Sequence, residues 1–173
     1  MKTRKRSFPL LQASFFYVGI LLLERLISNS PKRPQKLYEV QLKQAPWAPP
    51  SWVFGPAWVL INIFLTRALF ILLSKKKWSP SDKALLSLQG GIWIVFCSFG
   101  YFYFRKKSPA MAALSTLMDT GLATTSILIA RKRDPKFAVN YLPLFAWTWF
   151  ASSLAVYQAL ENDDPLLGTS AIF

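Results

Sequence analysis

The chain has 173 residues, of which 53% are hydrophobic and 16% aromatic, and its formal net charge is +13. A hydrophobic fraction this high is unusual for a soluble domain and is typical of an integral membrane protein. The chain has no histidine, which excludes a histidine-based catalytic triad and histidine-ligated zinc or haem. We therefore expect no metal site and no required cofactor.

The positive charge does not indicate nucleic-acid binding. Lys and Arg gather in the breaks between apolar stretches, at residues 2–6, 32–36, 75–77, 105–107 and 131–133. Basic residues that flank apolar segments orient them in a membrane and contact anionic lipid. The expected partner is the lipid bilayer, and no nucleic acid is expected.

Five apolar stretches are long enough to cross a bilayer, which takes about 20 residues. The stretches lie at about 8–28, 50–74, 84–104, 109–130 and 137–160. The sequence therefore predicts an all-α protein, a single domain over 1–173 that forms an integral membrane bundle of five transmembrane helices.

The first stretch, FPLLQASFFYVGILLLERLIS, has the basic start of a signal peptide. No small-x-small cleavage site follows it, which favours an uncleaved helix. The stretch contains Glu24 and Arg25 near its end, and these side chains could pair with each other or extend toward the lipid headgroups.

Basic residues also indicate the orientation in the membrane. The amino terminus and the loops near Lys75 and Arg131 together carry more positive charge than the other side, whose carboxyl end holds Glu161 and Asp163. By the positive-inside rule the amino terminus is expected in the cytoplasm.

The second stretch begins with PWAPPSWVFGPAW, residues 46–58, which combines four prolines with three tryptophans. Pro56 cannot donate a hydrogen bond to the carbonyl of Trp52, so a loosened first turn is expected. Within a membrane, backbone groups freed in this way must be buried in protein or line a cavity. A cavity is therefore expected beside this entrance to the helix.

Two tryptophans inside the predicted spans are candidates for a binding site. Trp58 and Trp147 each lie close to a proline, Pro56 and Pro143, at which a helix is distorted. A flat aromatic ligand could stack between such side chains. Ordinary core packing is the alternative.

Two ionisable residues, Arg67 and Asp119, also lie inside predicted spans. A charge at this depth is costly unless it finds a partner or water, so each is a candidate functional residue. The alternatives are an ion pair across the bundle or a side chain that reaches the interface.

The stretch LYEVQLKQAPWAPPSWVFGPAW, residues 37–58, resembles the signature of the tryptophan-rich sensory protein family. This family is also called the translocator protein or peripheral benzodiazepine receptor (TspO/MBR) family. The resemblance resumes at Gln89 and at YLPLFAWTWFASSLAVYQALEN, residues 141–162. It implies a five-helix membrane bundle, commonly a homodimer, with a pocket beneath a ligand-capping loop at about 29–49. It also implies binding of porphyrins such as protoporphyrin IX, haem, sterols or aromatic drugs.

The resemblance carries the ligand-binding positions of the family onto this chain. They are Tyr38, Trp47, Pro49, Pro50, Trp52, Phe54, Trp58, Gln89, Pro143, Trp147, Ala151 and Asn162. Trp58 and Trp147 resemble the tryptophans implicated in porphyrin breakdown in some bacterial members, and they are catalytic candidates only if this chain degrades porphyrin. Porphyrin propionates are expected near Lys36, Lys43 or the amides of the loop.

The chain departs from the family pattern at several of these sites. Asn62 replaces a usual Tyr in the second helix, and Trp93 and Phe96 replace Asn and Trp in the third. Both Asn62 and Trp93 are retained as predicted ligand contacts. Ala155 stands where Asn is usual, and the acids after Tyr157 do not support a cholesterol motif.

The leading interpretation is a membrane receptor or sensor that binds porphyrins or other flat hydrophobic ligands in a tryptophan-lined pocket. One alternative is an enzyme that degrades porphyrin photo-oxidatively. Others are a transporter or scavenger of tetrapyrroles, sterols or lipids, and a membrane protein with protein partners and a degenerate pocket. The expected location is the bacterial inner membrane rather than the mitochondrial outer membrane.

Overall fold

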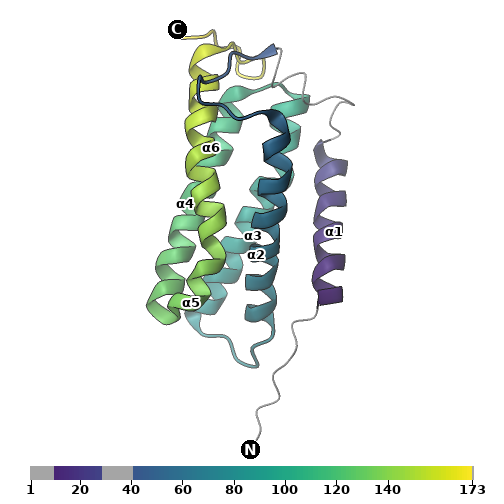
Figure 1. Ribbon diagram of the computed structural model, residues 1–173, viewed down its shortest axis with the longest axis vertical. Coiled ribbons are helices and arrows are strands. Elements are labelled where there is room, and N and C mark those ends of the chain that lie inside the picture. The colour runs from purple at the N-terminus through teal and green to yellow at the C-terminus, as the bar shows by residue number, and fades with distance from the viewer. Residues whose placement is uncertain (1–9, 29–40, 173) are drawn as a thin grey trace, which may run out of the picture.

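The computed structural model describes residues 10–28 and 41–172, and the regular elements in these ranges are all helical. This confirms the predicted all-α class. Five long helices run along the longest axis of the molecule (Figure 1). They are α1 (Leu10–Ser28), α2 (Phe54–Leu73), α3 (Pro80–Gly100), α4 (Pro109–Arg133) and α6 (Leu142–Glu161).

Short helical segments extend three of these helices. The 3-10 turn η2 (Ser51–Val53) precedes α2, and the π-helical turn η3 (Tyr101–Arg105) follows α3. The one-turn helix α5 (Pro135–Ala138) and the 3-10 turn η4 (Val139–Tyr141) lead into α6. In the part of the chain that the structure describes, three helical segments are long and apolar enough to cross a bilayer, namely Ser51–Leu73, Pro80–Arg105 and Pro109–Lys132.

Side chains in the loops determine where the helices begin. Ser79 and Asp82 form a capping box at α3, in which the Asp82 amide donates to Ser79 Oγ at 3.2 Å and the Ser79 amide donates to Asp82 Oδ2 at 2.9 Å. Lys75 adds an ion pair to Asp82 Oδ1 at 2.7 Å. These contacts start α3 at Pro80, four residues before the predicted span at 84. Ser108 caps α4 by accepting from the Met111 amide at 3.1 Å.

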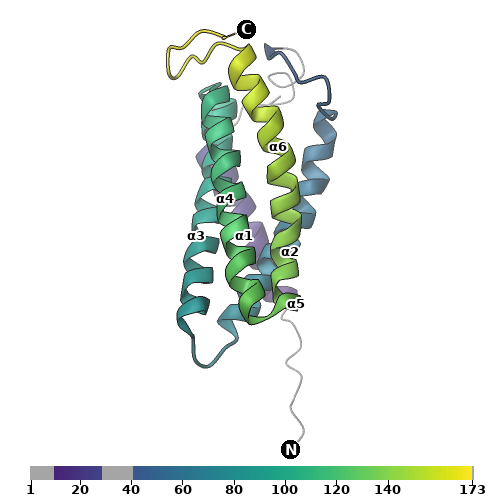
Figure 2. The ribbon, with the colours of Figure 1, turned by 90° about the vertical axis from the view of Figure 1, so that its left-hand side faces the viewer.

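Consecutive long helices run in opposite directions along the bundle, whereas α1 and α3 run in the same direction. Helix α6 lies along α4 (Figure 2), where Thr120 Oγ1 and Ser152 Oγ are 3.3 Å apart. Helix α3 packs between α4 and α1, and α1 stands at the edge of the bundle (Figure 1). This arrangement places α2 beside α6 and α1, opposite α4.

The dense core occupies one end of the bundle. It is formed by the last turns of α2, the first half of α3, the last turns of α4 and the segment from α5 to the start of α6. Its largest fully buried side chains include Ile61, Leu65, Leu85, Ile92 and Tyr141. The opposite end holds a smaller cluster of buried residues, Tyr103, Ala112, Ala113 and Ala155, and is less tightly filled.

The structure corrects one sequence-based hypothesis. Arg67 is exposed on α2, whereas Asp119 on α4 is only 3% exposed. Ion pairs within the described part of the chain include those of Lys43 with Glu161 and of Lys75 with Asp82. Arg67 and Asp119 thus do not pair across the bundle, because α2 turns Arg67 outward.

Candidate ligand-binding cavity

A cavity of about 310 Å³ lies in the less tightly filled end of the bundle. Its walls come from η2 and the first turns of α2, from the end of α3 with η3, and from the facing parts of α1, α4 and α6. The volume is near the lower end of the about 300–1,000 Å³ typical of small-molecule sites. The loosened entrance to α2 that Pro56 predicts is part of this wall.

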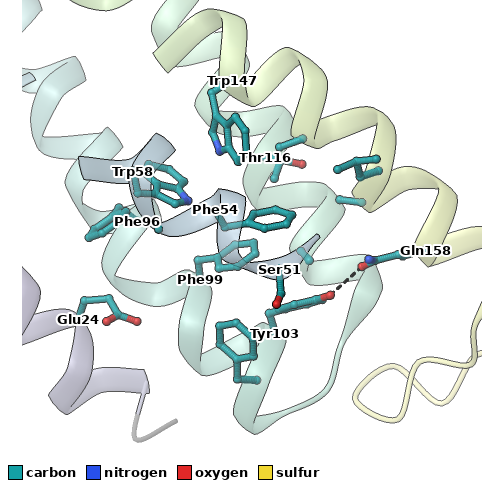
Figure 3. Close-up of a pocket in the computed structure, with 16 residues that line it drawn as sticks. Glu24, Ser51, Phe54, Trp58, Phe96, Phe99, Tyr103, Thr116, Trp147 and Gln158 are labelled. Carbon is teal, nitrogen blue, oxygen red and sulfur yellow. Dashed lines mark hydrogen bonds between the residues drawn. The ribbon is translucent and has the colours of Figure 1, made fainter. Parts of the chain in front are cut away.

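Aromatic rings form a large part of the wall (Figure 3). The rings of Trp58 and Phe96 have centroids 4.9 Å apart, and the ring of Phe54 meets that of Trp147 edge to face at 5.4 Å. Phe99 lies 5.3 Å from Tyr103. Edge-to-face and tilted contacts of this kind hold ring faces in place without filling the space between them.

Two local features place these rings. The 3-10 turn η2 is closed by the hydrogen bond from the Val53 amide to the Pro50 carbonyl at 3.0 Å, and it delivers Phe54 to the start of α2. The π-helical turn η3 widens the end of α3, where both Tyr103 and Phe104 line the cavity. Single π-helical turns inside α-helices frequently occur at functional sites.

A chain of hydrogen bonds connects the cavity to the segment before α2. Tyr103 Oη donates to Gln158 Oε1 at 2.9 Å, as drawn in Figure 3, and Gln158 Nε2 donates to Gln44 Oε1 at 2.6 Å. Both Tyr103 and Gln158 line the cavity. These hydrogen bonds thus connect the cavity wall to residues 41–50, the described part of the connection between α1 and α2.

Four of the predicted ligand contacts line the cavity together. Phe54 and Trp58 of α2 and Trp147 of α6 are labelled in Figure 3, and Ala151 lies one turn after Trp147 on α6. Trp58 and Trp147, which are far apart in the sequence, thereby line the same cavity. Their role in binding a ligand stays a prediction.

The other two tryptophans of the second-helix motif lie outside the cavity. Trp47 is half-exposed, its Nε1 donates to Ser153 Oγ at 3.2 Å and its ring packs 5.6 Å from that of Tyr157. Trp52 is 72% exposed and faces away from the bundle. An exposed tryptophan at the start of a membrane-spanning helix is typical of the interfacial aromatic belt of a membrane protein.

Three predicted contacts lie in the dense core instead. Gln89 is fully buried, and its Nε2 donates to the Leu65 carbonyl of α2. Asn62 is 1% exposed, and Trp93 packs edge to face against Phe16 at 5.6 Å. These residues do not line the cavity, so any contact with a ligand requires the core to open.

The remaining predicted positions frame the site or fall elsewhere. Pro49 and Pro50 precede η2, and Pro143 lies in the first turn of α6 at the opposite end of the bundle. Asn162 Oδ1 accepts from the Lys43 amide at 2.7 Å, and both residues line a second, solvent-facing cavity near the carboxyl terminus. Tyr38 and Lys36 lie outside the described residues.

Sequence reasoning missed several residues of the wall. Phe99, Tyr103, Thr116 and Gln158 all line the cavity. Tyr103 and Gln158 are polar residues within apolar helices, and such residues usually have an interior partner, but their mutual contact spans 55 positions. Glu24 of α1 also lines the cavity, although its place near the end of the span suggested only a partner or a headgroup.

Taken together, a helical bundle whose described part includes three apolar helices of membrane-spanning length, with a cavity inside it, defines an integral membrane protein. A model of the TspO/MBR family matches residues 13–160. The chain therefore belongs to the TspO/MBR family, as the sequence motifs indicated.

Two relatives support this assignment. The chain is similar to the tryptophan-rich protein TspO of Archaeoglobus fulgidus, with 28% identity over 114 residues, which cover 64% of this chain and 72% of the relative. It is also similar to the tryptophan-rich protein TspO of Chlorobaculum tepidum, with 25% identity over 131 residues, which cover 73% of this chain and 80% of the relative.

Proposed function

We propose that this TspO/MBR family member is a membrane receptor or sensor that binds porphyrin-like, flat hydrophobic ligands in the cavity between α2, α3, α4 and α6. The observation that carries the proposal is the convergence of Phe54 and Trp58 with Trp147 on one cavity. Planar rings gain from stacking on such faces, and each indole adds an N–H donor. The protein would act in a bacterial or archaeal cell membrane, as a homodimer.

The test is quenching of tryptophan fluorescence by protoporphyrin IX, measured in darkness on the detergent-purified protein. Saturable quenching at micromolar concentrations is expected. The double variant Trp58→Ala with Trp147→Ala should weaken binding about tenfold or more, because it removes two ring faces worth about 1 kcal/mol each.

The matched control is Trp52→Ala, which removes an exposed indole outside the cavity. Its affinity for protoporphyrin IX should equal that of the wild type. Unchanged affinity of the double variant would contradict the proposal, whatever the control shows.

A second candidate function is light-dependent degradation of the bound porphyrin. The observation in its favour is that Trp58 and Trp147, the two catalytic candidates, both line the cavity. Illumination of the complex in air should then bleach the porphyrin absorbance, and Trp58→Phe with Trp147→Phe should stop the bleaching while binding persists. Stable absorbance under light would leave binding alone as the function.

A further inference from the structure

A positive charge lies on the outer face of α2. The apolar segment Ser51–Leu73 has membrane-spanning length, and Arg67 is its one charged residue. Leu60, Ile63 and Arg67 are all exposed, and they are spaced three and four residues apart, so they share one face of the helix. Because the exposed face of a spanning helix contacts lipid, Arg67 is a charge placed among apolar side chains at the lipid boundary.

The acids of the chain do not neutralise this charge. Within the part of the chain that the structure describes, Arg67 forms no ion pair. At the same end of the bundle, Asp82 binds Lys75 at 2.7 Å and Asp134 caps α5. The one acid outside the described residues is Glu39, which precedes the segment that leads into the opposite end of α2. The remaining acids lie inside the bundle or toward that opposite end, at Glu24, Asp119, Glu161, Asp163 and Asp164.

The depth of Arg67 in the membrane brings it near one lipid surface. It lies six residues before Leu73, the last residue of α2, which corresponds to about 9 Å along the helix axis. The spanning segment of 23 residues is about 35 Å long, slightly more than a hydrocarbon core of about 30 Å. A guanidinium is costly in hydrocarbon without a partner, but a long arginine side chain at this depth can extend to the headgroups.

The end of α2 carries further positive charge at the level of the headgroups. Lys76 and Lys77 follow the helix and are exposed. Trp78, beside them, is 45% exposed, and its Nε1 donates to the Leu72 carbonyl at 3.2 Å. A tryptophan in this position is typical of the membrane–water interface. The groups available to Arg67 there are the phosphates of lipids, which match the planar fork of a guanidinium.

We propose that Arg67 binds the phosphate of an anionic phospholipid in the leaflet at which α2 ends, with an acyl chain of that lipid along Ile63 and Leu60. Lys76 and Lys77 favour a headgroup that has no positive charge of its own. A zwitterionic lipid offers the same phosphate, but its ammonium group is repelled by these lysines. The site lies outside the aromatic cavity, so it does not depend on the proposed function.

Native mass spectrometry of the detergent-solubilised protein tests this site. The protein is titrated with phosphatidylglycerol or with phosphatidylcholine that has the same acyl chains. The wild type should bind the first phosphatidylglycerol more tightly by about tenfold, the size expected for one charge-assisted contact. Arg67→Gln should lose most of this preference, because an amide keeps the length of the side chain without its charge. Arg67→Lys should keep part of it, because an ammonium cannot bind a phosphate in the bidentate way.

The matched control is Arg131→Gln. It removes an exposed arginine at the same end of the bundle, on α4 instead of α2. This variant should keep the preference of the wild type for phosphatidylglycerol. An unchanged circular dichroism spectrum of Arg67→Gln would report that the helices are intact.

Four results would overturn the inference. The first is equal affinity of the wild type for the two lipids, and the second is a full preference retained by Arg67→Gln. An equal loss of preference in Arg131→Gln would show that the total charge of this end, rather than a site on α2, attracts the lipid. Dissociation of a wild-type dimer by Arg67→Gln, with lipid affinities unchanged, would show that Arg67 contacts a second copy of the chain.

Discussion

Individual side chains in the dense core differ in whether their polar atoms have partners. Within residues 10–28 and 41–172, both polar atoms of the Asn62 side chain are buried without a hydrogen-bond partner, and so is Thr66 Oγ1, one turn further along α2. Gln89 shows the opposite situation. It donates to the Leu65 carbonyl and accepts from Tyr141 Oη at 3.5 Å. A buried amide is costly only when its atoms are unpaired.

This difference predicts opposite effects for the same substitution at two sites. Asn62→Leu should raise the free energy of unfolding by about 1–2 kcal/mol, because it removes buried polar atoms without partners. Gln89→Leu should lower it by about 1–3 kcal/mol, because it leaves the buried Tyr141 hydroxyl without an acceptor. Denaturant unfolding in detergent, followed by circular dichroism, measures both. Destabilisation by Asn62→Leu would show that this amide has a partner in the membrane-embedded protein.

At the scale of elements, one carboxylate ties the segment after α6 to the start of α4. Asp164 Oδ2 accepts from Ser108 Oγ at 2.6 Å and from the Ala110 amide at 3.0 Å. Its Oδ1 accepts from the amides of Leu166 and Leu167 at 2.9 and 3.0 Å. A negative charge at the amino end of α4 is also favoured by the helix dipole.

These contacts predict a pH dependence of stability. Burial by itself raises the pKa of Asp164, but the hydrogen bonds from Ser108 and from the backbone amides outweigh it and lower that pKa below its ordinary value. The carboxylate therefore stabilises the fold above its unfolded pKa of about 4. This stabilisation is lost as the pH falls through the lower folded pKa.

Asp164→Asn should accordingly lower the free energy of unfolding at pH 7 by about 1–3 kcal/mol, and by much less at pH 3. Denaturant unfolding at the two pH values measures the difference. Asp163→Asn is the matched control, because Asp163 is exposed and its Oδ1 accepts from the Ala171 amide at 2.8 Å. An equal loss for Asp164→Asn at both pH values would argue against the carboxylate as the cause.

The hydrogen-bonded chain through Gln158 predicts a second effect at this scale. Gln158→Leu removes the acceptor of Tyr103 and the donor to Gln44. The segment at 41–50 should then open more readily, which hydrogen–deuterium exchange would record as faster exchange of its amides. Ser153→Ala should have a smaller effect, because it removes the acceptor of the exposed Trp47 side chain and a donor to the Phe150 carbonyl within α6. Identical exchange in wild type and Gln158→Leu would show that the segment is held by other contacts.

For the whole molecule, the described basic residues divide unevenly between the two ends. The loop with Lys75, Lys76 and Lys77 and the turn with Arg131 and Lys136 lie at one end of the bundle, where α1 begins (Figure 1). The opposite end carries Lys43, Arg105, Lys106 and Lys107, and the acids Glu161, Asp163 and Asp164 at that end offset most of their charge. The fold thus gathers at one end the loops whose charge predicted a cytoplasmic amino terminus.

This arrangement predicts the membrane topology. In a Cys97→Ser background, a membrane-impermeant thiol reagent applied to intact cells should label Asp163→Cys. It should label Lys76→Cys only after the membrane is opened, because the positive-inside rule places that loop in the cytoplasm. Labelling of the two positions in the reverse order would show the opposite orientation and would leave the fold unaffected.

The sequence by itself determined the helical class, the membrane character and the family. Long apolar stretches, basic breaks between them and the motif at residues 37–58 are local features, and each reports on the segment that contains it. The proline at position 56, also a local feature, predicted a distorted first turn of this helix with a cavity beside it, and Phe54 and Trp58 line the cavity found there.

Only the tertiary structure decided which residues share the cavity. Whether an aromatic residue faces a cavity, the core or lipid depends on how helices far apart in sequence rotate and pack against one another. In this way Trp58 and Trp147 line the same cavity, Trp93 packs in the core against Phe16, and Trp52 is exposed. Glu24 became part of the wall for the same physical reason, because α1 packs against α3 and η3.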